Sequence, residues 1–455
     1  MKHDVEGNMF RFVWLGICLL GVPAVAADWP QWRGPEGQGH APTARDLPKQ
    51  WKIGPPGKEV AGGDNIQWRT EIPGRAWSSA MIVDDVVWLT TALEHGVGNE
   101  GPPPPGGKKP QPRSVAASVT FRALAIDRKD GEILHDLELF SVDNPQPTHV
   151  LNSFASPSPV IGSSYLYCQF GDYGTACVDI KKASLVWHNR SQRLNHENGP
   201  GSSPVLWKDL LIFHCDGSDV QYVVALDRKT GEEVWRTDRS GEMNDNPEMK
   251  KSYGTPLVTS VGGRDVLLSP ASDWLYGYDP KTGNELWKVK YGILGFSIVP
   301  RPVVVDEVAY ISTSFMKTEL LALQLGPTET TQPQILWRYK RSVPRMPSPL
   351  LVGDAVYLFS DKGIATCLDK VTGEARWTGR LGGSFSSSPI LADGKIYVGN
   401  REGEMFVIKP GNELDILTKN DFDEAIMASP AAIDNSLYVR TDKAMYRIEK
   451  TDAKQ

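Results

Sequence analysis

Residues 227–235 read Asp-Arg-Lys-Thr-Gly-Glu-Glu-Val-Trp, and this stretch decides the fold because its Asp and Trp return along the chain at the same spacing. The spacing recurs in four other places: Asp179–Trp187, Asp279–Trp287, Asp369–Trp377 and, with His in place of Trp, Asp127–His135. Self-similarity at a fixed period is the signature of stacked supersecondary units. The sequence therefore predicts a repeat protein.

The residues of this phrase favour a tight turn between two strands. The Asp, at positions 127, 179, 227, 279 and 369, can accept a hydrogen bond from its own backbone two residues on, and Gly supplies a positive φ. Two positions before each Asp stands a small residue, which suggests that a large side chain packs there: Ala125, Cys177, Ala225, Gly277 and Cys367. We expect the Trp to fill that space.

A second phrase marks the start of each unit. A small or polar residue followed by Pro appears at Ser158-Pro159, Ser203-Pro204, Thr255-Pro256, Arg301-Pro302, Ser348-Pro349, Ser388-Pro389 and Ser429-Pro430, and Ser79-Ala80 is an eighth start without its Pro. Short alternating runs such as 355–359 and 395–399 follow each start. One unit therefore reads as four short antiparallel strands.

Four-stranded units of forty-odd residues are typical of β-propeller blades. The sequence predicts an all-β, eight-bladed propeller of four-stranded antiparallel blades. The last unit holds only three strand-like runs, and residues 66–70 fit the vacant place. An N-terminal strand that completes the C-terminal blade would close the ring and pair an open sheet edge.

The pattern Ala-x-Asp-x-x-Thr-Gly-x-x-x-Trp resembles the tryptophan-docking motif of the PQQ-like (pyrroloquinoline-quinone-repeat) β-propellers, a superfamily of quinoprotein dehydrogenases and BamB-like assembly factors. The resemblance covers about residues 66–450. It implies blade-docking roles for six tryptophans: Trp68, Trp187, Trp235, Trp287, Trp337 and Trp377. His135 and Leu417 hold the other two docking positions.

The ends of the chain have separate expected roles. Residues 1–27 combine a short apolar run with a small-residue cleavage site, as in a secretory signal peptide, so we expect an exported, soluble protein, periplasmic or extracellular, without a transmembrane span after cleavage. Residues 28–65 form an N-terminal segment that either packs its tryptophans on the ring or serves as a tether. The propeller follows at 66–450, with a disordered Pro- and Gly-rich insertion at 94–114 and a tail at 451–455.

Charge and residue spacing disfavour nucleic-acid binding and metal binding as functions. A net charge of −6 without a basic stripe disfavours nucleic-acid binding. Cys168 and Cys177 flank a turn and either form a disulfide or act as small buried apolar residues. No Cys and His spacing matches a zinc site, and the oxygen-rich run 242–246 does not match a calcium loop, so no metal is predicted.

Residues near the start phrases are expected to face the central channel, because the first strand of a blade is innermost. The candidate ligand-binding residues are Trp77, Asn152, Asn198, Tyr253, Arg301 and Arg345. Arg301 and Arg345 could clamp a carboxylate or phosphate, and the two asparagines could orient it. The alternative is that they bind solvent or neighbouring loop carbonyls.

The resemblance implies a non-catalytic binding or scaffold protein of the cell envelope, similar to BamB. We expect this chain to be a monomer, to have an envelope protein as its partner and to need no cofactor. One alternative is a PQQ-dependent quinoprotein dehydrogenase that oxidises an alcohol or sugar, with PQQ and calcium in the central funnel. The sequence lacks the Cys-Cys pair that many such enzymes carry. Another alternative is recognition of a polysaccharide or peptide on the propeller face.

Overall fold

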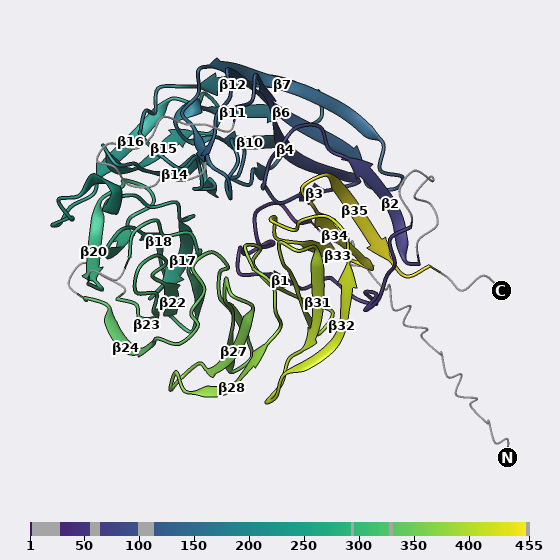
Figure 1. The fold of residues 1–455 in the computed structure, drawn as a ribbon. Helices are drawn as coiled ribbons and strands as arrows, with labels where there is room; N and C mark the ends of the chain where they lie inside the picture. Colours follow the sequence, from purple (N-terminus) through teal and green to yellow (C-terminus); the bar gives the residue numbers. More distant parts are fainter. Residues whose placement is uncertain (2–27, 55–63, 99–112, 293–294, 327–330, 452–455) are drawn as a thin grey trace.

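The computed structural model describes residues 1, 28–54, 64–98, 113–292, 295–326 and 331–451, and these form a closed ring of eight β-sheets (Figure 1). The all-β, eight-bladed prediction is confirmed. Apart from Met1, the expected signal peptide lies outside the described residues, as do residues 99–112 of the insertion and 452–455 of the tail.

Each blade is an antiparallel sheet whose strands follow one another from the channel to the rim. The first four blades are β3 (Met81–Val83), β4 (Val86–His95), β6 (Ser118–Asp127) and β7 (Ile133–Asp143); β9 (Val160–Gly162), β10 (Tyr165–Gln169), β11 (Thr175–Asp179) and β12 (Ser184–Asn189); β13 (Val205–Trp207), β14 (Leu210–Asp216), β15 (Gln221–Asp227) and β16 (Glu233–Asp238); and β17 (Leu257–Val261), β18 (Arg264–Pro270), β19 (Trp274–Tyr278) and β20 (Glu285–Lys290).

The last four blades are β21 (Val303–Val305), β22 (Val308–Ser312), β23 (Leu320–Gln324) and β24 (Gln334–Tyr339); β25 (Leu350–Val352), β26 (Ala355–Phe359), β27 (Ile364–Asp369) and β28 (Ala375–Arg380); β29 (Ile390–Ala392), β30 (Lys395–Gly399), β31 (Glu404–Lys409) and β32 (Asp415–Asp421); and β33 (Ala431–Ile433), β34 (Ser436–Arg440), β35 (Ala444–Glu449) and β2 (Ile66–Glu71). Outside the blades, β1 (His40–Ala41) pairs in parallel with β29, and β5 (Arg113–Ser114) pairs with β8 (Thr148–His149). Two short 3-10 turns, η1 (Gly171–Tyr173) and η2 (Pro247–Met249), lie in loops.

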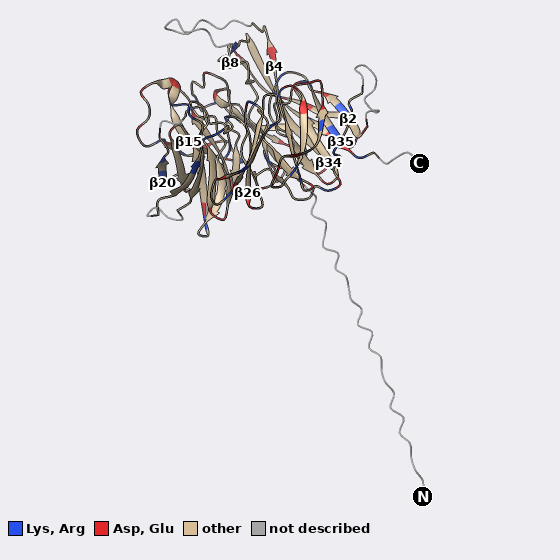
Figure 2. Ribbon diagram, turned by 60° about the horizontal axis from the view of Figure 1, so that its bottom comes forward, with Lys and Arg blue, Asp and Glu red and all other residues tan. Residues whose placement is uncertain are grey.

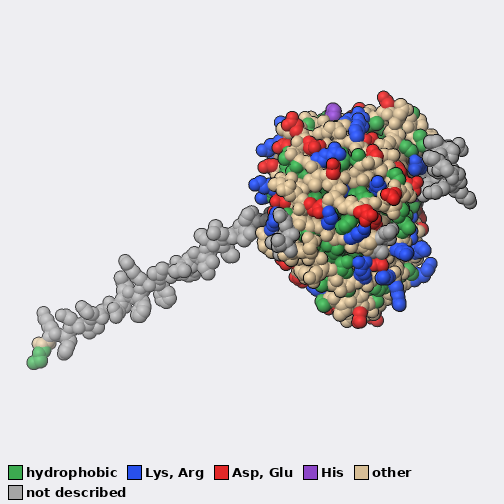
Figure 3. All heavy atoms as spheres, turned by 90° about the vertical axis from the view of Figure 1, so that its left-hand side faces the viewer, with side chains coloured by type: hydrophobic (Ala, Val, Ile, Leu, Met, Phe, Trp, Pro, Cys, Tyr) green, Lys and Arg blue, Asp and Glu red, His purple; other side chains and the backbone are tan. Residues whose placement is uncertain are grey.

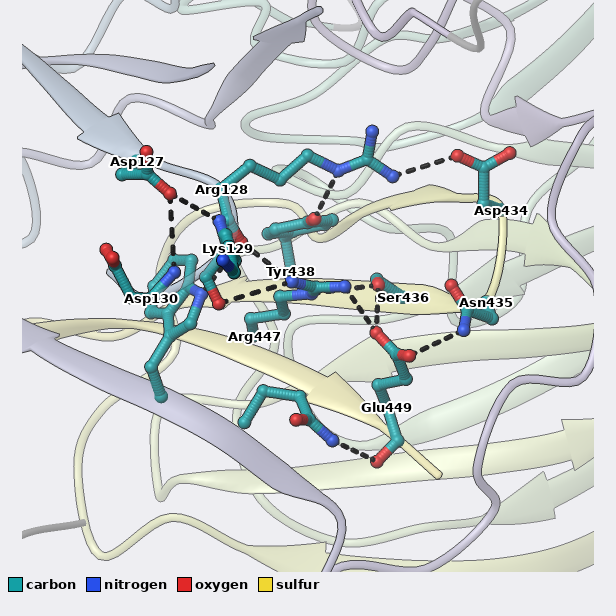
Figure 4. Close-up of polar contacts among 12 residues, drawn as sticks. Asp127, Arg128, Lys129, Asp130, Asp434, Asn435, Ser436, Tyr438, Arg447 and Glu449 are labelled. Atoms are coloured by element: carbon teal, nitrogen blue, oxygen red, sulfur yellow. Dashed lines mark hydrogen bonds and ion pairs between the residues drawn. The ribbon is translucent and has the colours of Figure 1, made fainter. Parts of the chain in front are cut away.

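The ring closes through β2, as predicted, because this N-terminal strand pairs antiparallel with β35. Side chains then fasten the last blade to the first (Figure 4). Arg128 of the first blade donates to the Tyr438 hydroxyl at 2.9 Å and to the Asp434 carboxylate at 2.8 Å. In the opposite direction, Arg447 donates to the backbone oxygen of Arg128 at 2.8 Å. The junction between the chain ends is therefore held as firmly as any other.

Six of the eight blade junctions share one contact between an indole and the next blade. The Nε1 atoms of Trp68, Trp187, Trp235, Trp287, Trp337 and Trp377 donate, at 3.0–3.2 Å, to backbone oxygens of Arg128, Arg228, Pro280, Gly326, Lys370 and Gly411. A Cβ built on Gly231 would lie 2.5 Å from the Trp187 ring, so the turn needs glycine for its positive φ and for this close approach. Within a blade, the small residue faces its own Trp, as Gly277 faces Trp287.

The two junctions without a docking Trp use other aromatic residues. After the first blade, where His135 stands, the long strand β7 carries Phe140 to within 5.8 Å of Phe170 in the second blade. After the seventh blade, where Leu417 stands, Trp51 from the N-terminal segment lies 5.8 Å from Phe422. The side chains that replace the missing indoles come from outside the repeat phrase.

Cys168 and Cys177 are buried free thiols and do not form the disulfide that the sequence left open. Cys168 is opposite Ala176 on the neighbouring strand, whereas Cys177 is opposite Tyr167. Successive rungs of a ladder project to opposite faces of the sheet, so the two sulfur atoms point apart. The cysteines therefore belong to two separate apolar clusters.

The insertion in the first blade is more ordered at its ends than expected. β4 continues to His95, Gly98 forms a bridge with Val115, and β5 pairs with β8. These pairings extend the first blade above the ring (Figure 2). None of the described helices is long and apolar enough to cross a membrane.

Candidate functional site: the central cavity

The ring encloses a cavity of about 1070 Å³ at its centre. Four of the six candidate ligand-binding residues line it: Trp77, Asn152, Asn198 and Tyr253. The start phrases lie in its wall, because the residue before each innermost strand faces inward. The cavity is therefore a site that the repeat itself builds.

A ring of hydroxyl hydrogen bonds encircles this cavity and explains the Ser or Thr of the start phrase. Each hydroxyl oxygen accepts from the backbone N–H of the equivalent residue in a neighbouring blade at 2.9–3.1 Å. The accepting side chains are Ser158, Ser203, Thr255, Ser348, Ser388, Ser429 and Ser79. A buried N–H needs a partner, so these hydroxyls join the blades at the channel wall.

Arg301 interrupts the hydroxyl ring and turns away from the cavity. Its guanidinium, 2% exposed, donates to the backbone oxygens of Pro256 and Trp32, both at 3.1 Å. Burial without a carboxylate partner lowers the pKa of Arg301 to about 9. The cavity wall therefore lacks the expected clamp between Arg301 and Arg345, since neither residue lines it.

Arg345 is placed by two contacts, one of them with Phe315, which itself lines the cavity. Its guanidinium carbon lies 5.3 Å from the centre of the Phe315 ring, a cation–π contact, and its backbone N–H donates to the Asp361 carboxylate at 2.7 Å. Arg301 thus donates to backbone oxygens, as the alternative expected, whereas the Arg345 guanidinium lies over an aromatic ring.

The N-terminal segment closes one end of the channel. We call residues 28–53 the strap. It hydrogen-bonds to the innermost strand, or in one case to a residue two positions before it, in six blades, at Ile82, Ile161, Val304, Leu351, Leu391 and Ser429. Trp29 is buried, and the Trp32 indole donates to the Ser429 hydroxyl at 3.2 Å and lines the cavity. The strap is the floor of the cavity.

The two amides predicted to orient a ligand, those of Asn152 and Asn198, form hydrogen bonds within the cavity wall. The Asn152 side chain donates to the Asn198 backbone oxygen at 2.8 Å, and the Asn198 side chain donates to the Tyr253 hydroxyl at 3.3 Å. That hydroxyl donates to the His196 backbone oxygen at 2.7 Å, and burial raises the pKa of Tyr253 above its ordinary range. This network joins the Asn152, Asn198 and Tyr253 side chains to the backbone of the cavity wall.

The mouth of the cavity carries charged side chains, most of them paired. Lys251 bonds to the Glu197 carboxylate, and Arg193 lies 3.7 Å from the Asp172 carboxylate. Arg113, at the end of the insertion, forms no ion pair with any residue of the described ranges. Burial, with help from Arg113, lowers the pKa of His149, which is therefore neutral at pH 7.

Two buried polar atoms of the cavity lining have no hydrogen-bond partner in the part of the chain that the structure describes: Trp77 Nε1 and Gln146 Oε1. Sequence reasoning found Trp77 but missed Gln146, Arg113 and Trp32, which lie outside the repeat phrases. Across the described ranges, no three His, Cys, Asp or Glu side chains gather as metal ligands.

Comparison with known proteins identifies relatives of this chain. Residues 219–455 match the family model described as outer membrane protein assembly factor BamB. BamB of Shewanella oneidensis is 29% identical over 161 residues, which cover 34% of this chain and 38% of the relative. BamB of Legionella pneumophila (strain Paris) is 24% identical over 199 residues, covering 43% of this chain and 50% of the relative. The matches thus span half or less of these two relatives.

Solved structures share the fold. The crystal structure of BamB from Moraxella catarrhalis has a TM-score of 0.52 at 15% identity and covers 80% of this chain and 100% of that one. A europium-containing methanol dehydrogenase has a TM-score of 0.61 at 10% identity and covers 92% of this chain and 90% of that one. At such identities the likeness concerns the fold alone. Because the family model spans more than half of its residues, the chain belongs to the family described as outer membrane protein assembly factor BamB.

Proposed function

We propose that this protein is a non-catalytic scaffold of the cell envelope that holds a protein partner. The observation that carries the proposal is the match of residues 219–455 to the assembly-factor family. Three BamB relatives match the chain at 20–29% identity, and their name refers to assembly at the outer membrane. The export expected from residues 1–27 agrees with such a location.

The surface of the ring is suited to contact with another chain. The rim strands expose aliphatic side chains just before the docking position, at 41–52% exposure: Leu134, Val186, Val234, Leu336 and Ile416. Figure 3 shows apolar side chains among charges of both signs on one flank of the ring. Outer edge strands can accept an added strand, and the loops at the cavity mouth offer a second surface. A monomeric ring would leave both available.

Affinity purification of the full chain from cross-linked cell envelopes tests the proposal. We expect one envelope protein to be recovered in a fixed ratio to this chain and to bind again when both are purified. Failure of every recovered protein to bind as a purified component would contradict a scaffold. Incubation with PQQ, calcium and an alcohol or sugar is the second arm, and sustained reduction of a dye would instead establish a dehydrogenase.

A further inference from the structure

The two ends of the central cavity are built differently. The strap crosses one end of the channel and contacts six of the eight blades there. The other end is flanked by the extension of the first blade, where β8 stands above the ring (Figure 2). We therefore expect a ligand to enter beside Arg113 and His149, which lie in β5 and β8 and line the cavity.

The deep part of the cavity presents apolar groups. The hydroxyl oxygens of the start phrases each accept a hydrogen bond from the backbone of a neighbouring blade. Between them lie Trp32, Val299, Met346 and Met427. Methionine is unbranched and polarisable, and it adapts to apolar side chains of different shapes. The floor is thus suited to a large aliphatic or aromatic group.

Two buried polar groups of the lining lack partners among the described residues. Trp77 Nε1 is a donor and Gln146 Oε1 is an acceptor, both buried and without partners among the described residues. One donor and one acceptor are what a single peptide unit can satisfy. Arg113 at the mouth adds a cation that a carboxylate could pair with.

The charge and size of the cavity argue against other ligand classes. Three cationic and four anionic side chains line it, so a small polyanion would meet no excess of positive charge: Arg113, Arg193 and Lys251; Asp172, Glu197, Asp219 and Glu248. A sugar presents a hydroxyl on most of its carbons, whereas the Asn152 amide already bonds within the protein through its nitrogen and its oxygen. The volume of about 1070 Å³ slightly exceeds the roughly 300–1,000 Å³ common for small-molecule sites, which leaves room for a larger ligand.

We propose that the cavity binds an extended peptide segment that inserts a large apolar side chain toward Trp32 and the methionines and places a carboxylate beside Arg113. This inference rests on the proposed function and deepens it, because it assigns the partner's contact to the cavity mouth and not to the rim. The inserted backbone pairs with Trp77 Nε1 and Gln146 Oε1. Specificity comes from the apolar anchor and its acidic neighbour.

A displayed library of random peptides, selected on the full chain, tests the proposal. We expect enrichment of an aromatic or large aliphatic residue close to Asp or Glu. A labelled peptide from that selection should bind Val299→Asp at least about tenfold more weakly than the natural chain, a loss of about 1.4 kcal/mol. Val234→Asp is the matched control, because Val234 is 52% exposed on the rim strand β16.

The outcomes separate this inference from the proposed function. Equal peptide binding by Val299→Asp and the natural chain would overturn the cavity site, provided circular dichroism shows that both are folded. If Val299→Asp does not fold, Met427→Glu takes its place. An envelope partner that is retained by the cavity variant and lost by Val234→Asp would leave the scaffold intact and move its contact to the rim. Cavity-dependent binding of maltoheptaose, or of PQQ with calcium, in place of peptides would also refute the proposal.

Discussion

Replacement of Trp68 by Ala should weaken the closing junction between the last blade and the first. The indole is 5% exposed, and a buried Trp→Ala change usually costs about 3–5 kcal/mol. The lost hydrogen bond adds little, since the Arg128 backbone oxygen still accepts from Arg447 at 2.8 Å. We therefore expect a loss of about 3–5 kcal/mol in the free energy of unfolding, and a smaller loss for Trp68→Phe, which keeps a ring beside Gly131.

Urea denaturation followed by circular dichroism measures this loss, and hydrogen exchange locates it. Amides of β2 and β35 should exchange faster in Trp68→Ala, because their pairing joins the two chain ends. Trp287→Ala is the matched control: it removes an indole of similar burial at a junction within continuous chain and should leave β2 protected. A loss below about 1 kcal/mol in Trp68→Ala, or unchanged exchange in β2, would refute closure through this indole.

Three further changes test other parts of the ring. Ser388→Ala removes the acceptor of the Ser348 N–H, so we expect a loss of about 1–3 kcal/mol in urea denaturation; a loss within about 0.5 kcal/mol would contradict the hydroxyl ring. Burial raises the pKa of Asp273 to about 6, so the folded state binds this proton more tightly than the unfolded state and stability falls as pH rises from about 4 to 6. Asp273→Asn should therefore raise the free energy of unfolding at pH 7 by about 1–3 kcal/mol and leave it nearly unchanged at pH 4, and an equal effect at both pH values would exclude this linkage. Burial also raises the pKa of Cys168 and Cys177, so a thiol reagent should label neither until the protein is denatured, and a diamide-induced link between them would contradict the opposite facing of their side chains.

Much of the fold could be predicted because each repeat contains the residues that join one blade to the next. An indole, the glycine turn that it packs against and the Asp that shapes the turn all recur at fixed positions, so local chemistry specifies blade and neighbour together. The strand 66–70 was recognisable because it resembles other rim strands and the last unit lacked one. These features depend on short-range spacing, which a sequence displays directly.

The site was less predictable, because its geometry depends on contacts that leave no periodic trace. Arg301 stands where seven other units have Ser or Thr, and that exception was the available signal of a special role. The sequence does not show which way the Arg301 side chain points, because the acceptors of its guanidinium are backbone oxygens of Trp32 and Pro256. Backbone acceptors have no residue signature. Trp51 was missed for the same reason, because its place beside Phe422 compensates for a docking position that holds Leu417.

The pairing of β2 with β35 sets an order of events during synthesis. The ribosome makes residues 66–71 long before residues 444–449, so the first blade strand to be made has no partner while the intervening blades are translated. An unpaired strand in a nascent chain exposes free backbone N–H and C=O groups and is prone to associate with other chains. Production of this protein therefore depends on keeping its earliest strand from premature partners until the final one emerges.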